Sequence, residues 1–158
     1  GRIAVAQLDP AAAARAALFE YMNGNTDWAM RAGPGGDICC HNFRLMGAAA
    51  NSQYGLVPVP YDFDASGLVN APYAVPSEVL QMSSVRDRRY RGYCAHNSHA
   101  LAAAAEFRAK QGQLIGVLSA IPGLDERRRG SSAAYLQAFF RDIATDDLAK
   151  RVLKTCIN

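Results

Sequence analysis

The chain has 158 residues, of which half are apolar and a fifth charged, which is the composition of one globular domain long enough to bury a core. No apolar run approaches the roughly 20 residues that cross a bilayer, so a membrane-spanning helix is excluded and no membrane partner is expected. The net charge is +3, but residues 1–80 hold four basic and seven acidic residues, and residues 81–158 hold thirteen and seven. An acidic half beside a basic half suits a cation site next to a surface that attracts anions; the alternative is a solvated basic face that keeps the protein in solution.

The elements expected in the first half of the chain are one helix and one hairpin. Asp9-Pro10 is typical of a helix N-cap followed by Pro at the first helical position, so a helix is predicted over 11–22, ending at Asn23-Gly24-Asn25. Short apolar runs at 43–46 and 56–61 predict a β-hairpin with a long turn. Prolines at 58 and 60 place the second run at an edge.

The second half is expected to be mainly helical. After a loop over 64–76, the sequence predicts a short helix from Ser77 and longer helices over 100–118, 131–143 and 146–156. Residues 127–129, three arginines, are expected in an exposed turn. The predicted fold is therefore α+β and mostly helical, with residues 1–158 forming a single domain.

Two features bear on the origin of the chain. It begins Gly1-Arg2-Ile3 without an initiator Met, which predicts a fragment of a longer protein. It has four cysteines without CxxC spacing, which leaves room for one or two disulfides or for four reduced thiols. The even count favours an extracytoplasmic location, but the compartment stays unknown. The cysteines are Cys39, Cys40, Cys94 and Cys156.

Three polar clusters stand where packing alone would not require them. One is the string GNTD at 24–27, directly after the first helix; the second is His41-Asn42, before the hairpin; the third, Asp62-Phe63-Asp64, follows it. Because a hairpin brings its ends together, the second and third should lie side by side, and the helix can deliver the first. Carboxylate and carboxamide oxygens are the ligands that Mg²⁺ or Mn²⁺ takes together with substrate phosphates.

These motifs, in this order, resemble the C-terminal lobe of protein-kinase-like folds. GNTD is similar to the catalytic loop of the atypical branch that includes the toxin-type HipA kinases and the spore-coat-protein-H kinases. Residues 60–74 (PYDFDASGLVNAPYA) resemble that branch's form of the Asp-Phe-Gly metal motif and a family of uncharacterised bacterial proteins. The resemblance covers about residues 10–95. It implies that Asp27 is the catalytic residue and that Asn42, Asp62 and Asp64 hold Mg²⁺ or Mn²⁺ at ATP, with Asn25 and His41 in support.

The sequence departs from the kinase pattern twice. Fourteen residues separate Asp27 from Asn42 where kinases have four, so Asp37, which has the four-residue spacing, is an alternative catalytic acid. No lysine precedes Lys110 and no sheet precedes the first helix, so the N-terminal nucleotide lobe is not present in this chain.

Several functions remain open at this point. The first is a kinase-like phosphotransferase acting on an unknown acceptor, either a protein or a small molecule. A metal-dependent phosphoester hydrolase would use the same carboxylates, and an inactive lobe would be a binding module. Asp27 could also be an ordinary turn residue, and His41 a strand cap. Basic residues without interleaved aromatics argue against nucleic acid. Possible substrate or phosphate contacts are Arg86, Arg88 and Arg89, although salt bridges to the acidic half would also explain them.

Overall fold

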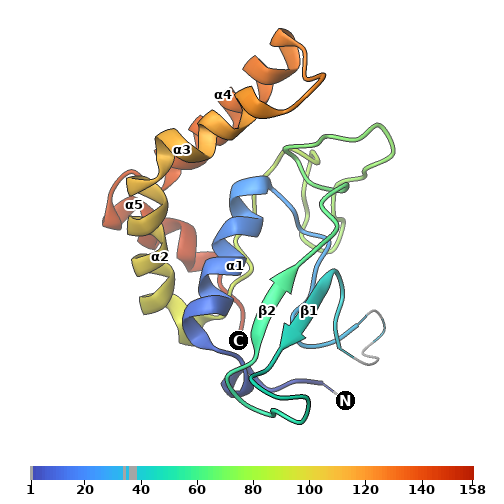
Figure 1. Cartoon of the computed structure of the whole chain (residues 1–158), viewed down its shortest axis with the longest axis vertical. Coiled ribbons are helices and arrows are strands. Elements are labelled where there is room, and N and C mark those ends of the chain that lie inside the picture. The colour runs from blue at the N-terminus through green and yellow to red at the C-terminus, as the bar shows by residue number, and fades with distance from the viewer. Residues whose placement is uncertain (1, 34, 36–38) are drawn as a thin grey trace.

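The computed structural model describes residues 2–33, 35 and 39–158. The fold is α+β, as the sequence predicts, with five α-helices and one two-stranded antiparallel hairpin in the described part of the chain, and it is about 46% helical. Helix α1 lies between the hairpin on one side and helices α2 and α5 on the other, while α4 runs across the end of this arrangement (Figure 1). The elements are α1 (Pro10–Asn23), β1 (Phe43–Met46), β2 (Val57–Pro60), α2 (Asn97–Ala109), α3 (Gln111–Gly116), α4 (Glu126–Asp142) and α5 (Asp146–Val152).

Helix α1 is the central element, and the sequence fixes both of its ends. The Asp9 carboxylate accepts a hydrogen bond from the Ala12 backbone N–H at 2.7 Å, and Pro10 occupies the first helical position. At the other end Gly24 adopts a left-handed conformation with φ 66°, which a glycine adopts without strain. A side chain there would also collide with the Tyr135 hydroxyl. The predicted helix is therefore confirmed.

The hairpin pairs β1 with β2 in the register Phe43↔Pro60 to Met46↔Val57. Alternation along the strands buries Phe43 and Pro58 and exposes Met46 and Val57, as expected of a sheet with one face on the core. The prolines of β2 are tolerated because both strands of this sheet are edges.

The core gathers aromatic side chains around α1 and α4. Tyr21 of α1 lies 6.0 Å from Phe139 of α4 and 6.3 Å from Tyr90, ring centroid to centroid, and all three are buried. Its hydroxyl donates to Asp142 at 3.0 Å, which satisfies the polar end of the ring. Trp28 packs on Phe43 at 5.4 Å and joins the loop after α1 to the hairpin.

Four of the predicted elements differ in the structure. The short helix from Ser77 is absent: residues 77–82 form turns. The helix over 100–118 breaks at Lys110 into α2 and α3. Helix α4 begins at Glu126 rather than 131, because Asp125 caps it by accepting from the Arg128 N–H at 2.8 Å; the three arginines at 127–129 are thus helical. The last α-helix ends at Val152 and continues as a 3₁₀ turn, Leu153–Thr155.

The four cysteines form two disulfides. Cys94–Cys156 joins the segment before α2 to the C-terminal residues, where the Cys94 N–H donates to the Ile157 carbonyl at 2.9 Å. Cys39–Cys40 joins adjacent residues shortly before β1. None of the described helices is long and apolar enough to cross a membrane.

Removing the disulfide that closes the longer loop, Cys94–Cys156, should destabilise the fold. Cys94 and Cys156 are 62 residues apart, so their bond restricts the unfolded chain, and the double variant Cys94→Ala/Cys156→Ala should lose about 2–4 kcal/mol of unfolding free energy. Urea denaturation followed by circular dichroism measures this. The Cys39→Ala/Cys40→Ala variant is the control, because a bond between neighbours closes almost no loop. Equal denaturation midpoints for the first variant and the wild type would contradict this prediction.

Candidate functional site

The candidate site begins at the loop that follows α1. The Asn25 side chain is buried, and its Oδ1 accepts a hydrogen bond from the Asp27 backbone N–H at 3.0 Å, which is a local Asx-type turn. The Trp28 indole N–H donates to the Asn25 carbonyl at 3.1 Å. Asn25 thus fixes the conformation of the loop that carries Asp27.

The half-buried guanidinium groups of Arg91 and Arg88 also hold this loop and the end of α1. Arg91 Nη1 donates to the carbonyls of Thr26 at 2.6 Å and Trp28 at 2.9 Å. Arg88 donates to the carbonyls of Tyr21 and Met22 in the last turn of α1, where the Tyr21 carbonyl also accepts from the Gly24 N–H. The interpretation that these arginines form salt bridges to the acidic half is therefore wrong for Arg88, whose partners are backbone carbonyls.

Asp27 projects from this fixed loop toward His41 and Asn42. Its Oδ1 lies 2.7 Å from His41 Nε2, and Asn42 Nδ2 donates to the Asp27 carbonyl oxygen at 2.7 Å and to Oδ2 at 3.2 Å. The backbones of Ala29 and His41 also pair through two hydrogen bonds. The side chain of Asp27 is nevertheless 54% exposed. The structure therefore brings the first two polar clusters into direct contact while one carboxylate stays open to solvent.

The third cluster joins the other two through the end of the hairpin. The Tyr61 N–H donates to the Asn42 carbonyl at 3.0 Å, and Asn25 Nδ2 reaches the Asp62 carbonyl at 3.5 Å. Asn42 and Asp62 both have positive φ, 55° and 63°. Asn and Asp adopt this left-handed conformation more readily than other non-glycine residues, which explains why they occupy the two hairpin ends. The expected meeting of the three clusters is found.

A cleft of about 830 Å³ opens beside Asp27. Asp27 and Thr26 line one part of it, and Asp64 and Tyr73 another, with the Tyr73 hydroxyl donating to Asp64 Oδ2 at 3.1 Å. Asn42 and Asp62 do not line this cleft. The predicted site is therefore divided, because among its four main residues only Asp27 and Asp64 line the cleft. Sequence reasoning missed Tyr73, which lies within the 60–74 motif but has no role in the kinase pattern.

Oxygen-bearing side chains stand at both ends of the hairpin. Asn42 directs its Nδ2 toward Asp27, and Asp62 and Asp64 are exposed. Among residues 2–33, 35 and 39–158, no three His, Cys, Asp or Glu side chains lie close enough together to hold a metal ion by themselves. Carboxylate and carboxamide oxygens are the types of ligand that Mg²⁺ takes together with phosphates and water.

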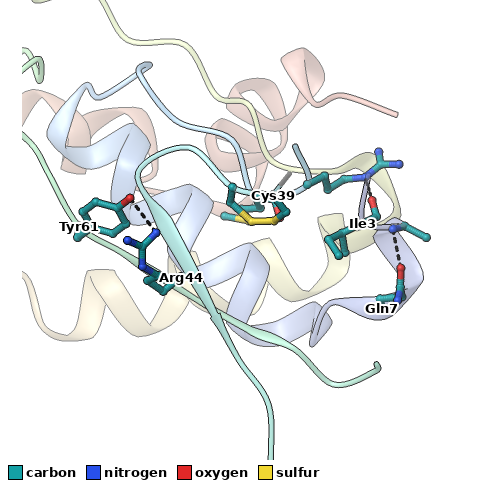
Figure 2. The surroundings of a disulfide bond; sticks show 9 residues. Ile3, Gln7, Cys39, Arg44 and Tyr61 are labelled. Carbon is teal, nitrogen blue, oxygen red and sulfur yellow. Dashed lines mark hydrogen bonds between the residues drawn. A yellow bond between two sulfur atoms is a disulfide. The ribbon is translucent and has the colours of Figure 1, made fainter. Parts of the chain in front are cut away.

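The remaining predicted residues have the following positions. Arg89 is exposed and donates to the Leu80 carbonyl at 3.4 Å, and Arg86 stacks 4.6 Å from the Tyr135 ring centroid; neither lines the cleft at Asp27. Asp37, the alternative catalytic acid, lies outside the described residues. The Cys39–Cys40 disulfide lies beside the hairpin, where Arg44 hydrogen-bonds Tyr61 at 3.1 Å (Figure 2). That disulfide immediately precedes His41 in the chain.

Glu20 is a buried acid near the site, and no pattern in the sequence singles it out. It lies on α1 with 0% exposure, and neither of its carboxyl oxygens has a hydrogen-bond partner among the described residues. Burial raises the pKa of Glu20 to about 8, and the nearby Asn25 side chain opposes this only in part. At neutral pH the group is therefore protonated inside the fold, next to the residue that fixes the Asp27 loop.

Comparison with protein-family models, with curated proteins and with solved structures yields no match for this chain.

The buried Glu20 should make stability depend on pH. Because its pKa is about 8 in the folded protein and about 4.5 when unfolded, the folded state holds a proton that the unfolded state releases between these values. This contribution to the unfolding free energy falls as pH rises from 4.5 to 8. Glu20→Gln mimics the protonated form and should stabilise the protein by about 1–3 kcal/mol at pH 7.

Urea denaturation of both proteins across pH 4.5–8.5 measures the effect of Glu20. Glu106→Gln is the matched control, since Glu106 is on a helix surface and pairs with Arg15 and Lys110. If Glu20→Gln and the wild type show the same pH dependence, Glu20 is not the buried acid described above.

Proposed function

We propose that this chain is a kinase-like phosphotransferase lobe in which Asp27 acts on the acceptor hydroxyl and Asn42, Asp62 and Asp64 face Mg²⁺ or Mn²⁺ with ATP. The observation that carries the proposal is the fixing of the Asp27 carboxylate by His41 and Asn42 at the edge of a cleft. The sequence does not identify the phosphate acceptor, which is either a protein or a small molecule.

The position of Asp27 suits a residue that handles a substrate proton. Its backbone is held by Asn25, Asn42 and Arg91 acting on the same loop, so the carboxylate does not need to be ordered when substrate arrives. Half of its side chain still faces solvent and can reach a hydroxyl in the cleft. In phosphoryl transfer an aspartate accepts the proton of the attacking hydroxyl or orients it, and the site otherwise works by position and charge.

The residues at the end of the hairpin carry the metal-binding part of the proposal. Asp62 and Asp64 follow β2 at the hairpin end where Asn42 precedes β1, and of these three residues only Asp64 lines the cleft beside Asp27. A bound divalent cation would neutralise charge on the transferring phosphoryl group. The sequence has no lysine before Lys110 and so lacks the strand lysine of kinases. The proposal therefore concerns the metal and acceptor side of the site.

A phosphoester hydrolase is a second candidate, favoured by the contact between His41 and Asp27. His41 Nε2 lies 2.7 Å from Asp27 Oδ1, and a carboxylate paired with an imidazole can activate a water molecule. Such an enzyme would act on simple phosphate esters without a nucleotide. The third alternative, an inactive binding module, predicts nucleotide binding without turnover.

Titration calorimetry with Mn²⁺ and ATP tests the metal and nucleotide part. Binding should require the metal, and Asp62→Ala should weaken it about 10-fold or more, since a hydrogen-bonded or coordinating charge is lost. Asp147→Ala on α5, whose carboxylate is 86% exposed and remote from the cleft, is the matched control and should bind as the wild type does. Equal affinities for Asp62→Ala and Asp147→Ala would refute the metal role of Asp62.

Asp27→Asn tests the chemical role separately from binding. The amide keeps the size and can still bond to His41 and Asn42, so ATP affinity should change little, while phosphate release or transfer should fall about 100-fold or more because the base is lost. Malachite-green assays with ATP, and with p-nitrophenyl phosphate in its place, measure this. If the wild type hydrolyses p-nitrophenyl phosphate and Asp27→Asn does not, the phosphoester hydrolase is favoured. Unchanged turnover of ATP by Asp27→Asn would sink the proposed role of this residue.

A further inference from the structure

A second pocket, away from the Asp27 cleft, has the chemistry of an anion site. It has a volume of about 430 Å³ and is lined by residues of the segment 68–70, by Arg86, by the turns that precede α4 and by the first turns of α4. This volume lies within the roughly 300–1,000 Å³ that small-molecule sites occupy. Its polar side chains are Arg86, Arg128, Asn70, Ser131 and Ser132, and none of its lining residues is acidic.

Arg86 is the residue that distinguishes this pocket from a chance hollow. Its guanidinium lies 4.6 Å from the Tyr135 ring centroid and is half-buried, but among the described residues no carboxylate or carbonyl accepts from it. The neighbouring Arg88 stacks on the same ring at 3.6 Å and donates its hydrogen bonds to backbone carbonyls. Arg86 is thus held in place by packing with its hydrogen-bond donors left for another molecule.

The charge around Arg86 is positive and only partly balanced. Burial lowers the pKa of Arg88, and the nearby charge of Arg86 lowers it further. Asp87, the next residue along the chain, already accepts from the backbone N–H groups of Ser83 and Ser84. Arg128 pairs with Asp125 at 3.5 Å. An anion in the pocket would therefore relieve the repulsion between Arg86 and Arg88 and satisfy the free donors of Arg86.

Part of the pocket lining is apolar. Leu118, Ile121 and Leu124 contribute to it, and Ile121 is 42% exposed. Two of the lining residues are tied to the rest of the fold by hydrogen bonds: the Leu68 N–H donates to the Asn23 carbonyl at 2.9 Å, and the Leu124 carbonyl accepts from Arg129 at 3.0 Å. A pocket lined both by charged donors and by aliphatic side chains matches a molecule with the same two parts.

We propose that this pocket, named here the Arg86 pocket, binds a small organic anion in which a carboxylate or phosphate group is attached to a short aliphatic chain. The anionic group lies on Arg86, with Arg128 and the hydroxyls of Ser131 and Ser132 around it. The chain lies on Leu118, Ile121 and Leu124. This site is independent of the Asp27 cleft and of the phosphotransferase activity proposed above.

Calorimetric titration of the full chain with hexanoate, hexyl phosphate and hexanol tests the proposal. The two anions should bind and the neutral alcohol of equal chain length should bind at least about 10-fold more weakly, because it lacks the charged partner for Arg86. Comparison of the two anions tells which head group the pocket prefers. Equal binding of hexanol and both anions, or no binding of either anion to folded protein, would overturn the proposal.

Variants locate the binding. Arg86→Gln should weaken the preferred anion about 10-fold or more, and Arg128→Gln, whose side chain is 78% exposed and therefore tolerates the change, should weaken it by a smaller factor. Arg89→Gln is the matched control, because Arg89 is a neighbouring exposed arginine that does not line the pocket. Thermal unfolding checks that each variant is folded. Full affinity in both Arg86→Gln and Arg128→Gln would place the anion elsewhere and reject the assignment.

Discussion

The hydrogen bonds that hold the loop from Asn25 to Trp28 are the constraint on which the rest of the candidate site depends. Helix α1 can end at this place only because Gly24 takes a left-handed conformation against Tyr135. From there the Asn25 side chain, Arg91 and Asn42 each bind a backbone group of the loop, so three segments far apart in the sequence meet at one turn. The Asp27 carboxylate is left as the exposed group on a rigid support, which is the arrangement that positioned catalysis requires.

The cost of this arrangement falls on buried polar groups. Glu20, about one turn before the loop, is fully buried, its carboxyl oxygens accept no hydrogen bond from the described residues, and burial raises its pKa to about 8. The Tyr135 hydroxyl, beside Gly24, is also buried without a partner in the described part of the chain. Groups of this kind destabilise a fold unless something repays them. Unpaired buried groups also occur away from the end of α1 in the described part of the chain, at His96, Asn97 and Arg129.

Much of the fold could be predicted from the sequence, because helix ends and strands depend mainly on residues close together in the chain. Asp9-Pro10 and Gly24 act through their own backbone, and the apolar runs around Phe43 and Val57 follow the period of a strand. The meeting of Asp27, Asn42 and Asp62 followed from hairpin geometry for the same reason. The start of α4 was missed because Arg127–129 suggested a solvated turn, whereas the Asp125 cap decides the boundary. The partners of Arg88 and the burial of Glu20 depend on tertiary packing, which no spacing in the sequence reveals.

Nuclear magnetic resonance with Mn²⁺ as a paramagnetic probe tests the central claim most directly. In the isotope-labelled chain with ATP present, Mn²⁺ bound at the hairpin end should broaden the amide signals of residues 25–27, 41–43 and 61–65 first. It should leave those of α5 (Asp146–Val152) sharp, because paramagnetic relaxation falls steeply with distance. Broadening confined to these three segments is the result the account predicts. Uniform weak broadening, or broadening centred on the exposed acids of α5, would show that the three polar clusters meet for structural reasons and hold no metal.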